Sequence, residues 1–66
     1  MTNPADRIRA IRRQTGLSQA RFAARYGIPK RTIEDWEAGQ RVPPSYVLAL
    51  LERAVSDDYP EPVTSA

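Results

Sequence analysis

Residues 19–38 read QARFAARYGIPKRTIEDWEA, and this stretch decides the fold. Apolar side chains recur at helical spacing on both sides of Gly27, which predicts a helix of about eight residues, a turn and a second helix. Ala23 is small enough for the second helix to cross closely, and Gly27 accepts the positive φ that a tight turn requires. Ile33 and Trp36 share the inner face of the second helix. The spacing therefore predicts two short helices packed on each other across a turn, the helix-turn-helix arrangement.

Glycines mark the ends of the predicted helices. Gly16, Gly27 and Gly39 are 11 and 12 residues apart, and each follows a segment with helical spacing, where a left-handed residue ends a helix. No stretch alternates polar and apolar residues for long enough to predict a strand. We therefore expect an all-α chain with four helices, over residues 4–15, 19–26, 29–38 and 44–55.

The segment of residues 56–66 differs in composition from the rest of the chain. It contains two prolines and three acidic residues, and it has too little apolar surface to offset the entropy of ordering. We therefore divide the chain into a folded domain, residues 1–55, and a flexible acidic tail, residues 56–66.

The composition excludes most catalytic chemistry. The 66 residues include no Cys and no His, which removes disulfides, thiolate nucleophiles, Cys/His zinc sites and imidazole acid–base chemistry. Glu34 and Asp35 are adjacent acids, but neighbouring helical positions diverge by about 100°, so they do not form a metal-binding or catalytic pair. We expect no enzyme activity, no cofactor and no metal.

Charge is distributed unevenly along the chain. The formal net charge is +2, yet residues 7–33 carry eight basic residues and no acidic one. Such a body attracts phosphate, so a nucleic acid is the expected partner. No apolar run approaches the roughly 18 residues of a membrane helix, and the first residues are too charged for a signal peptide. We expect a cytoplasmic protein that does not bind a membrane.

More than a dozen positions fall in the register of a known pattern: Leu17, Ser18, Gln19, Phe22, Ala23, Tyr26, Gly27, Ile28, Thr32, Ile33, Trp36, Glu37, Gly39, Arg41 and Pro43. In these positions the chain resembles the helix-turn-helix regulators of the lambda-repressor and Cro-like (Xre) family, which includes antitoxins that repress their own operons. The resemblance covers about residues 5–55. It implies a compact four-helix lambda-repressor-like domain with a central helix-turn-helix, although the family usually has a fifth helix for which this chain has no room.

The resemblance also implies which residues contact bases. Helix 29–38 is then the recognition helix in the major groove, with Lys30, Arg31 and Asp35 facing base edges. Arg31 can bind guanine O6 and N7 with two hydrogen bonds, Lys30 can do so less selectively, and Asp35 can accept from cytosine N4. The alternative for Lys30 and Arg31 is a solvated helix start. For Asp35 the alternative is a carboxylate that phosphates repel.

Phosphate contacts are implied at three further positions, Gln19, Thr32 and Arg41. Gln19 begins its helix, where free backbone amides favour an anion, and the family position also braces a recognition-helix side chain. Four other arginines either add to the positive field or only solubilise the domain: Arg9, Arg13, Arg21 and Arg25.

A structural ion pair is expected inside the domain. Helical periodicity points Arg12 into the inner face of the first helix, where a charge needs a partner, and places Glu37 beside the inner face of the third. The resemblance implies that Arg12 and Glu37 form a partly buried pair. Phe22 and Trp36 have the spacing of core residues, so we expect them in the core and not stacked on bases.

Without a fifth helix, the outer side of the fourth helix is a candidate dimer or partner surface, formed by Tyr46, Ala49, Leu50 and Arg53. The alternative is that Tyr46 and Leu50 close a small core. We expect a sequence-specific DNA-binding transcriptional regulator, a repressor that binds a palindromic operator as a homodimer with half-sites about 34 Å apart. The alternative function is an antitoxin or protein-interaction module that binds a toxin or another protein through helix 44–55 or the acidic tail.

Overall fold

Four α-helices make up the part of the chain that the structure, a computed structural model, describes, which is residues 3–60. They are α1 (Pro4–Thr15), α2 (Gln19–Tyr26), α3 (Lys30–Ala38) and α4 (Ser45–Asp58). Residues 3–60 contain no strand, so the prediction of an all-α chain with four helices is confirmed. None of these helices is both long enough and apolar enough to cross a membrane.

Local capping groups set where the first two helices begin. Asn3 Oδ1 accepts a hydrogen bond from the Asp6 amide at 2.8 Å, and Ser18 Oγ accepts one from the Arg21 amide at 3.2 Å. Each bond satisfies an amide that has no partner within its own helix, which stabilises the helix by about 1 kcal/mol. Gly27 ends α2 with φ 68°, in the left-handed region that a residue with a Cβ atom disfavours.

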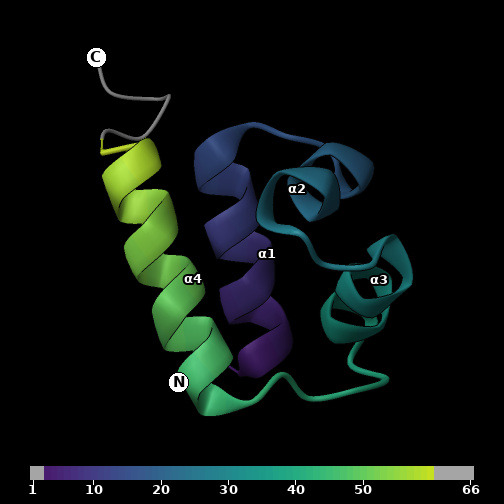
Figure 1. The fold of residues 1–66 in the computed structure, drawn as a ribbon. Coiled ribbons are helices and arrows are strands. Elements are labelled where there is room, and N and C mark those ends of the chain that lie inside the picture. Colours follow the sequence, from purple (N-terminus) through teal and green to yellow (C-terminus); the bar gives the residue numbers. More distant parts are fainter. Residues whose placement is uncertain (1–2, 61–66) are drawn as a thin grey trace.

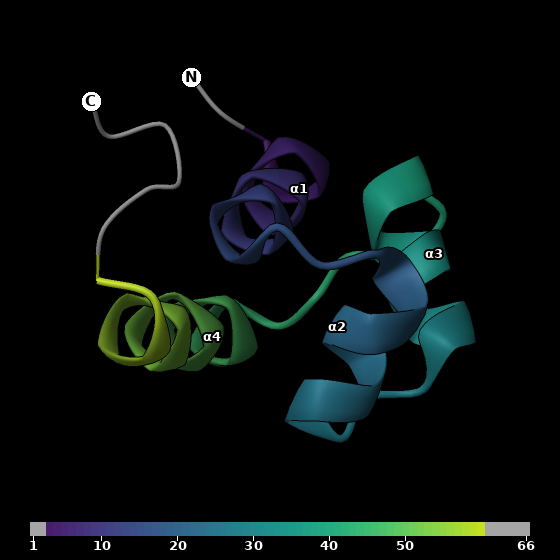
Figure 2. The ribbon, with the colours of Figure 1, turned by 90° about the horizontal axis from the view of Figure 1, so that it is seen from above.

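Helix α1 is the centre of the fold, because it packs against each of the other three helices. Figure 1 shows α4 along one side of α1 and the α2–α3 pair along the other. In Figure 2 the ribbon of α4 lies apart from the ribbons of α2 and α3, while side chains of α2 reach the last turn of α4. One side of α3 therefore packs on α1 and α2, and its opposite side is open to solvent.

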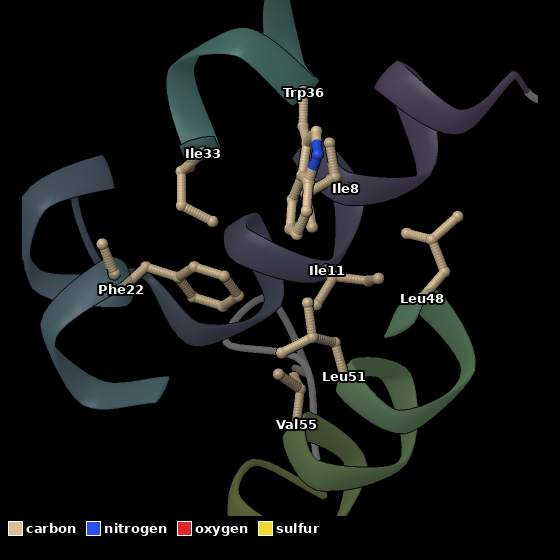
Figure 3. Packing of buried hydrophobic residues seen from close by; sticks show 9 residues of the cluster. Ile8, Ile11, Phe22, Ile33, Trp36, Leu48, Leu51 and Val55 are labelled. Atoms are coloured by element: carbon tan, nitrogen blue, oxygen red, sulfur yellow. The ribbon is translucent and has the colours of Figure 1, made fainter. Parts of the chain in front are cut away.

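Side chains from all four helices meet in one hydrophobic core (Figure 3). The largest fully buried members are Phe22, Ile8, Ile33, Leu48 and Val55. Burying a side chain of this size stabilises a fold by about 1.5–3 kcal/mol. Trp36 also belongs to this core, so the prediction that Phe22 and Trp36 are core residues is confirmed.

Helix α4 is longer than the sequence pattern indicated. Its predicted end at Val55 is wrong, because the helix continues to Asp58. The part of residues 56–66 that was expected to be flexible thus begins with a helical turn, residues 56–58. Residues 61–66 of that predicted tail lie outside the described residues.

The last turn of α4 is held by contacts from α1 and α2. The Tyr26 hydroxyl donates to Asp58 Oδ2 at 2.9 Å, and Arg25 lies 3.2 Å from the same oxygen. The Gln14 side-chain amide donates to the Tyr59 carbonyl at 2.9 Å, and the Arg25 guanidinium lies 5.5 Å from the centre of the Tyr59 ring. These contacts, which we call the C-terminal clamp, involve residues far apart in sequence, and a local helical pattern does not contain them.

Helix α4 also leaves large apolar side chains in solvent. Tyr46 is 68% exposed and Leu50 is 63% exposed. The alternative that these two residues close the core is therefore wrong, because Leu48, Leu51 and Val55 fill the core side of α4.

Candidate nucleic-acid interface

The solvent side of α3 is polar because the apolar residues of this helix are used on the core side. Ile33 and Trp36 are buried. Lys30 and Arg31, the first two residues of α3, have side chains that are 57% and 83% exposed. A short helix with two exposed cations in its first turn has the dimensions and the hydrogen-bond donors to read base edges in a major groove.

Each of these cations faces an acid one helical turn later. Lys30 Nζ lies 3.3 Å from Glu34 Oε2, and Arg31 Nε lies 3.5 Å from Asp35 Oδ1. The exposed face of α3 therefore carries paired charges and little net charge of its own. Exposed pairs of this kind contribute only about 0.2–1 kcal/mol, so both cations remain available to a guanine edge or a phosphate.

Asp35 lies deeper than the sequence pattern indicated. Its side chain is 20% exposed, whereas that of Arg31 is 83% exposed and that of Arg41 is 76% exposed. Asp35 Oδ2 lies 3.8 Å from Arg41 Nε, so one carboxylate contacts two arginines from different segments. The Asp35 carboxylate thus lies near Arg31 from the first turn of α3 and near Arg41 from the loop that follows α3.

The three residues expected at phosphates lie before, within and after α3. Gln19 is the first residue of α2, and its side-chain amide donates to Glu37 Oε1 at 3.0 Å, so it braces a side chain of α3. Thr32 is half-buried in the first turn of α3. Arg41 follows α3 and is highly exposed. Gln19 thus contacts α3 from the helix before it, and Arg41 lies in the segment after it.

Arg12 and Glu37 form the ion pair that joins α1 to α3. Arg12 Nε donates to Glu37 Oε2 at 2.7 Å, and Arg12 Nη2 donates to Glu37 Oε1 at 3.1 Å. The third nitrogen of the guanidinium, Nη1, donates to the Leu17 carbonyl at 3.0 Å. Arg9 Nη1 donates to the Glu37 backbone carbonyl at 2.6 Å. The Glu37 side chain is 7% exposed and that of Arg12 is 22% exposed, so the pair is largely withdrawn from water.

The environment of this pair sets the charge state of both groups. Burial by itself raises the pKa of the Glu37 carboxyl, but hydrogen bonds from Arg12 and Gln19 outweigh burial and hold this pKa below its ordinary value. The hydrogen bond to Glu37 raises the pKa of Arg12. Both groups are therefore charged at neutral pH, and they fix α3 to α1 and α2.

A second surface lies on α4, on the side away from the core. Tyr46, Ala49, Leu50 and Arg53 are all exposed and recur at helical spacing, so they form one continuous stripe, which we call the α4 stripe. Val42, in the loop before α4, is 73% exposed and was missed by the sequence reasoning. The signal that could have found Val42 was its position four residues before Tyr46, although Val42 lies outside the helix. The C-terminal clamp was also missed, because nothing local in the sequence indicates it.

Residues 3–60 include no group of three or more acidic side chains that could hold a metal ion. The described part of the chain combines a short helix, α3, that packs across another helix, an exposed side of α3 with cations in its first turn, and polar residues before and after α3. These features define a DNA-binding helix-turn-helix regulator.

A comparison with protein families agrees with this class. The family model described as helix-turn-helix matches residues 8–55, which is more than two thirds of the chain. The chain belongs to this helix-turn-helix family, of the Xre or lambda-repressor-like type, as the resemblance predicted. No curated protein and no solved structure matches the chain.

Proposed function

We propose that the protein is a sequence-specific transcriptional repressor that inserts α3 into the major groove of its operator. The observation that carries this proposal is the position of Arg31, whose side chain is 83% exposed in the first turn of α3, opposite the buried Ile33 and Trp36. A guanidinium in this position can donate two hydrogen bonds to guanine O6 and N7. Lys30, one position earlier, supplies a second cation for a neighbouring base, with less geometric selectivity.

Phosphate contacts at Gln19, Thr32 and Arg41 fix the register of α3 in this proposal. Arg41 is a strong candidate, since it is exposed beyond the end of α3 and has the fork geometry that suits phosphate. The Gln19 side-chain amide donates a hydrogen bond to Glu37, so this side chain holds α3 in position. The backbone amides at the start of α2 are then the groups that bind a phosphate. We place this activity in the cytoplasm.

Repression requires only that the bound protein occupies DNA that another protein needs. Activation also requires a contact with the transcription machinery. The exposed face of α3 is nearly neutral, because Glu34 and Asp35 offset Lys30 and Arg31, so nonspecific attraction to DNA is weak. A single domain of this kind gains affinity by binding as a dimer to two half-sites.

The α4 stripe is the surface we propose for this homodimer. In an antiparallel pair of α4 helices centred between Ala49 and Leu50, Tyr46 of one copy lies opposite Arg53 of the other. Arg53 can then stack on the Tyr46 ring, and the small Ala49 admits Leu50 of the second copy. Such a stripe is complementary to itself, as a twofold interface requires.

A second candidate function uses the same stripe differently. Val42, Tyr46 and Leu50 are the exposed large hydrophobic residues of the described chain, and an exposed apolar patch fits a different protein as well as a second copy. In this alternative the protein is an antitoxin or interaction module that binds a toxin or other protein through α4. Sedimentation equilibrium tests which occupant the α4 stripe takes, because a homodimer forms from the purified protein alone, whereas a stripe that binds only another protein leaves it monomeric.

A point substitution tests whether the dimer serves DNA binding. Leu50→Glu puts a charge at the centre of the α4 stripe, so we expect a monomer that binds operator DNA at least ten-fold more weakly. Ala24→Glu adds the same charge at an exposed position of α2 and is the control for oligomeric state. A Leu50→Glu protein that still sediments as a dimer would remove the stripe from the interface.

The repressor proposal is tested by fluorescence anisotropy with the DNA upstream of the protein's own gene and with scrambled DNA, at two salt concentrations. We expect tighter binding to the upstream DNA, weakened by salt, and a loss of about 1–3 kcal/mol of discrimination at one base pair in Arg31→Ala. Arg13→Ala removes an exposed arginine of α1 and should leave discrimination unchanged. Equal, weak binding of both DNAs would refute the proposal and favour the protein partner.

A further inference from the structure

Asp35 is much less exposed than Lys30 and Arg31, the other two residues of α3 that were expected to face base edges. Its carboxylate is 20% exposed, while the two arginine side chains that contact it are 83% and 76% exposed. A carboxylate that reads cytosine must project outward to reach N4 in the groove. Asp35 instead lies beneath Arg31 and Arg41, which extend past it into solvent.

The contacts divide the carboxylate evenly between the two arginines. Oδ1 lies 3.5 Å from Nε of Arg31, and Oδ2 lies 3.8 Å from Nε of Arg41. In both cases the contacting nitrogen is Nε, the one nearest the backbone. The terminal nitrogens, Nη1 and Nη2, are therefore left to donate end-on to a guanine edge or to a phosphate.

The backbone of Asp35 also contacts the loop after α3. Its carbonyl accepts from the Gln40 amide at 2.9 Å and from the Arg41 amide at 3.3 Å, so the loop after α3 folds back over Asp35. Gly39 allows this reversal with φ 78°. Both the backbone and the side chain of Asp35 thus contact Arg41 in the loop that follows α3.

We propose that Asp35 is a positioning residue, which acts through Arg31 and Arg41 and does not read a base itself. The proposal rests on the proposed function, since it assigns the orientation of the residue that reads guanine and of a residue that contacts phosphate. A long arginine side chain loses rotamer freedom when it binds, and a carboxylate that holds Nε in advance lowers that loss. The negative charge of Asp35 also opposes binding to DNA at sequences where Arg31 finds no guanine.

A double-mutant cycle separates positioning from direct reading. The probes are a duplex that the wild-type protein selects from randomised DNA and the single-base variants of that duplex. Asp35→Asn and Asp35→Ser remove the charge with side chains no larger than aspartate, and circular dichroism melting identifies which variants are folded. Asp35→Glu restores the carboxylate four residues after Arg31.

We expect Asp35→Asn to reduce the preference at the base pair that Arg31→Ala affects by about 1.4- to five-fold, the range for an exposed ion pair. In the Arg31→Ala background the same change should have no further effect on that preference. Binding to scrambled DNA should become tighter in Asp35→Asn, and Asp35→Glu should recover most of the preference. A purely structural role would not produce the coupling to Arg31, whereas the tighter binding to scrambled DNA reports only the loss of a negative charge near the phosphates.

Two results would overturn the inference. If Asp35→Asn changes the preference at a different base pair, and does so equally with and without Arg31, then Asp35 reads that base directly. If folded Asp35 variants keep the full preference, the carboxylate does not position Arg31. In both cases the wild-type protein still selects a sequence, whereas failure of the wild-type protein to select any sequence defeats the proposed function itself.

Discussion

Replacing Glu37 by Gln removes one charge from the ion pair that fixes α3, with almost no change in side-chain volume. Glu37 Oε1 and Oε2 accept three hydrogen bonds, two from Arg12 and one from Gln19. In Glu37→Gln, the amide nitrogen faces a donor and the positive charge of Arg12 keeps no acidic partner among the described residues. The variant is therefore expected to be much less stable than the wild-type protein.

The size of the effect follows from burial. Removing one partner of a buried ion pair costs about 3–5 kcal/mol. The Arg12 side chain is 22% exposed and keeps its bond to the Leu17 carbonyl, so the lower end, about 3 kcal/mol, applies. For a domain of this size each kcal/mol lowers the melting temperature by about 4–8 °C, which gives a decrease of about 12–24 °C. A total stability of about 3–10 kcal/mol, from 0.05–0.15 kcal/mol per residue, leaves the variant marginally folded.

Thermal melting followed by circular dichroism measures this loss, and Glu52→Gln is the matched control. Arg7 donates to Glu52 with the same two nitrogens, at 3.3 and 2.9 Å, but those side chains are 38% and 45% exposed. Because water screens this pair, the control is expected to lose less than about 1 kcal/mol. If Glu37→Gln melts within about 4 °C of the wild-type protein, or if both variants lose the same stability, the ion pair does not hold α3 in place.

Three further predictions concern pH, a turn and the C-terminal clamp. The pKa of Glu37 is lower in the folded protein than its ordinary value of 4.5, so its contribution to stability is complete above pH 4.5 and is lost as the pH falls through the folded pKa. Melting temperatures measured from pH 7 to about pH 3 should fall more steeply for the wild-type protein than for Glu37→Gln, and parallel curves would contradict the assignment. Gly27→Ala should cost about 1–2 kcal/mol in chemical denaturation, since φ is 68° and nothing lies within 4 Å of the added Cβ, so the cost is backbone strain alone; an unchanged midpoint would contradict it. Tyr59→Ala removes the ring that Arg25 contacts and should cost about 1 kcal/mol and speed hydrogen exchange in the last turn of α4; protection equal to wild type would mean that the clamp does not hold this turn.

The starts and ends of the first three helices are predictable because their signals are local. Asn3 and Ser18 cap within three residues, and Gly27 ends α2 at the residue that the spacing indicates. The end of α4 was predicted three residues too early for the opposite reason. It depends on Tyr26 and Gln14, which lie 32 and 45 residues away in the chain from the residues they bind.

The candidate site divides in the same way. Helical periodicity alone places Arg31 outward and Trp36 inward, the resemblance adds Lys30 as an outward residue, and the structure has all three there. Periodicity does not predict the low exposure of the Asp35 side chain, because one of the residues that contact this carboxylate, Arg41, comes from the loop after α3. It also left two alternatives for Leu50, since an apolar residue at the edge of a helix face is buried only if another element covers it.

We propose that the exposed face of α3 is the surface that binds DNA. Two-dimensional NMR of the isotope-labelled protein, titrated with the DNA upstream of its own gene, tests this claim residue by residue. We expect the largest amide shifts at Lys30, Arg31, Gln19 and Arg41, with the side of α1 that faces α4 unaffected. Shifts confined to α4, with α3 unchanged at saturating DNA, would contradict it.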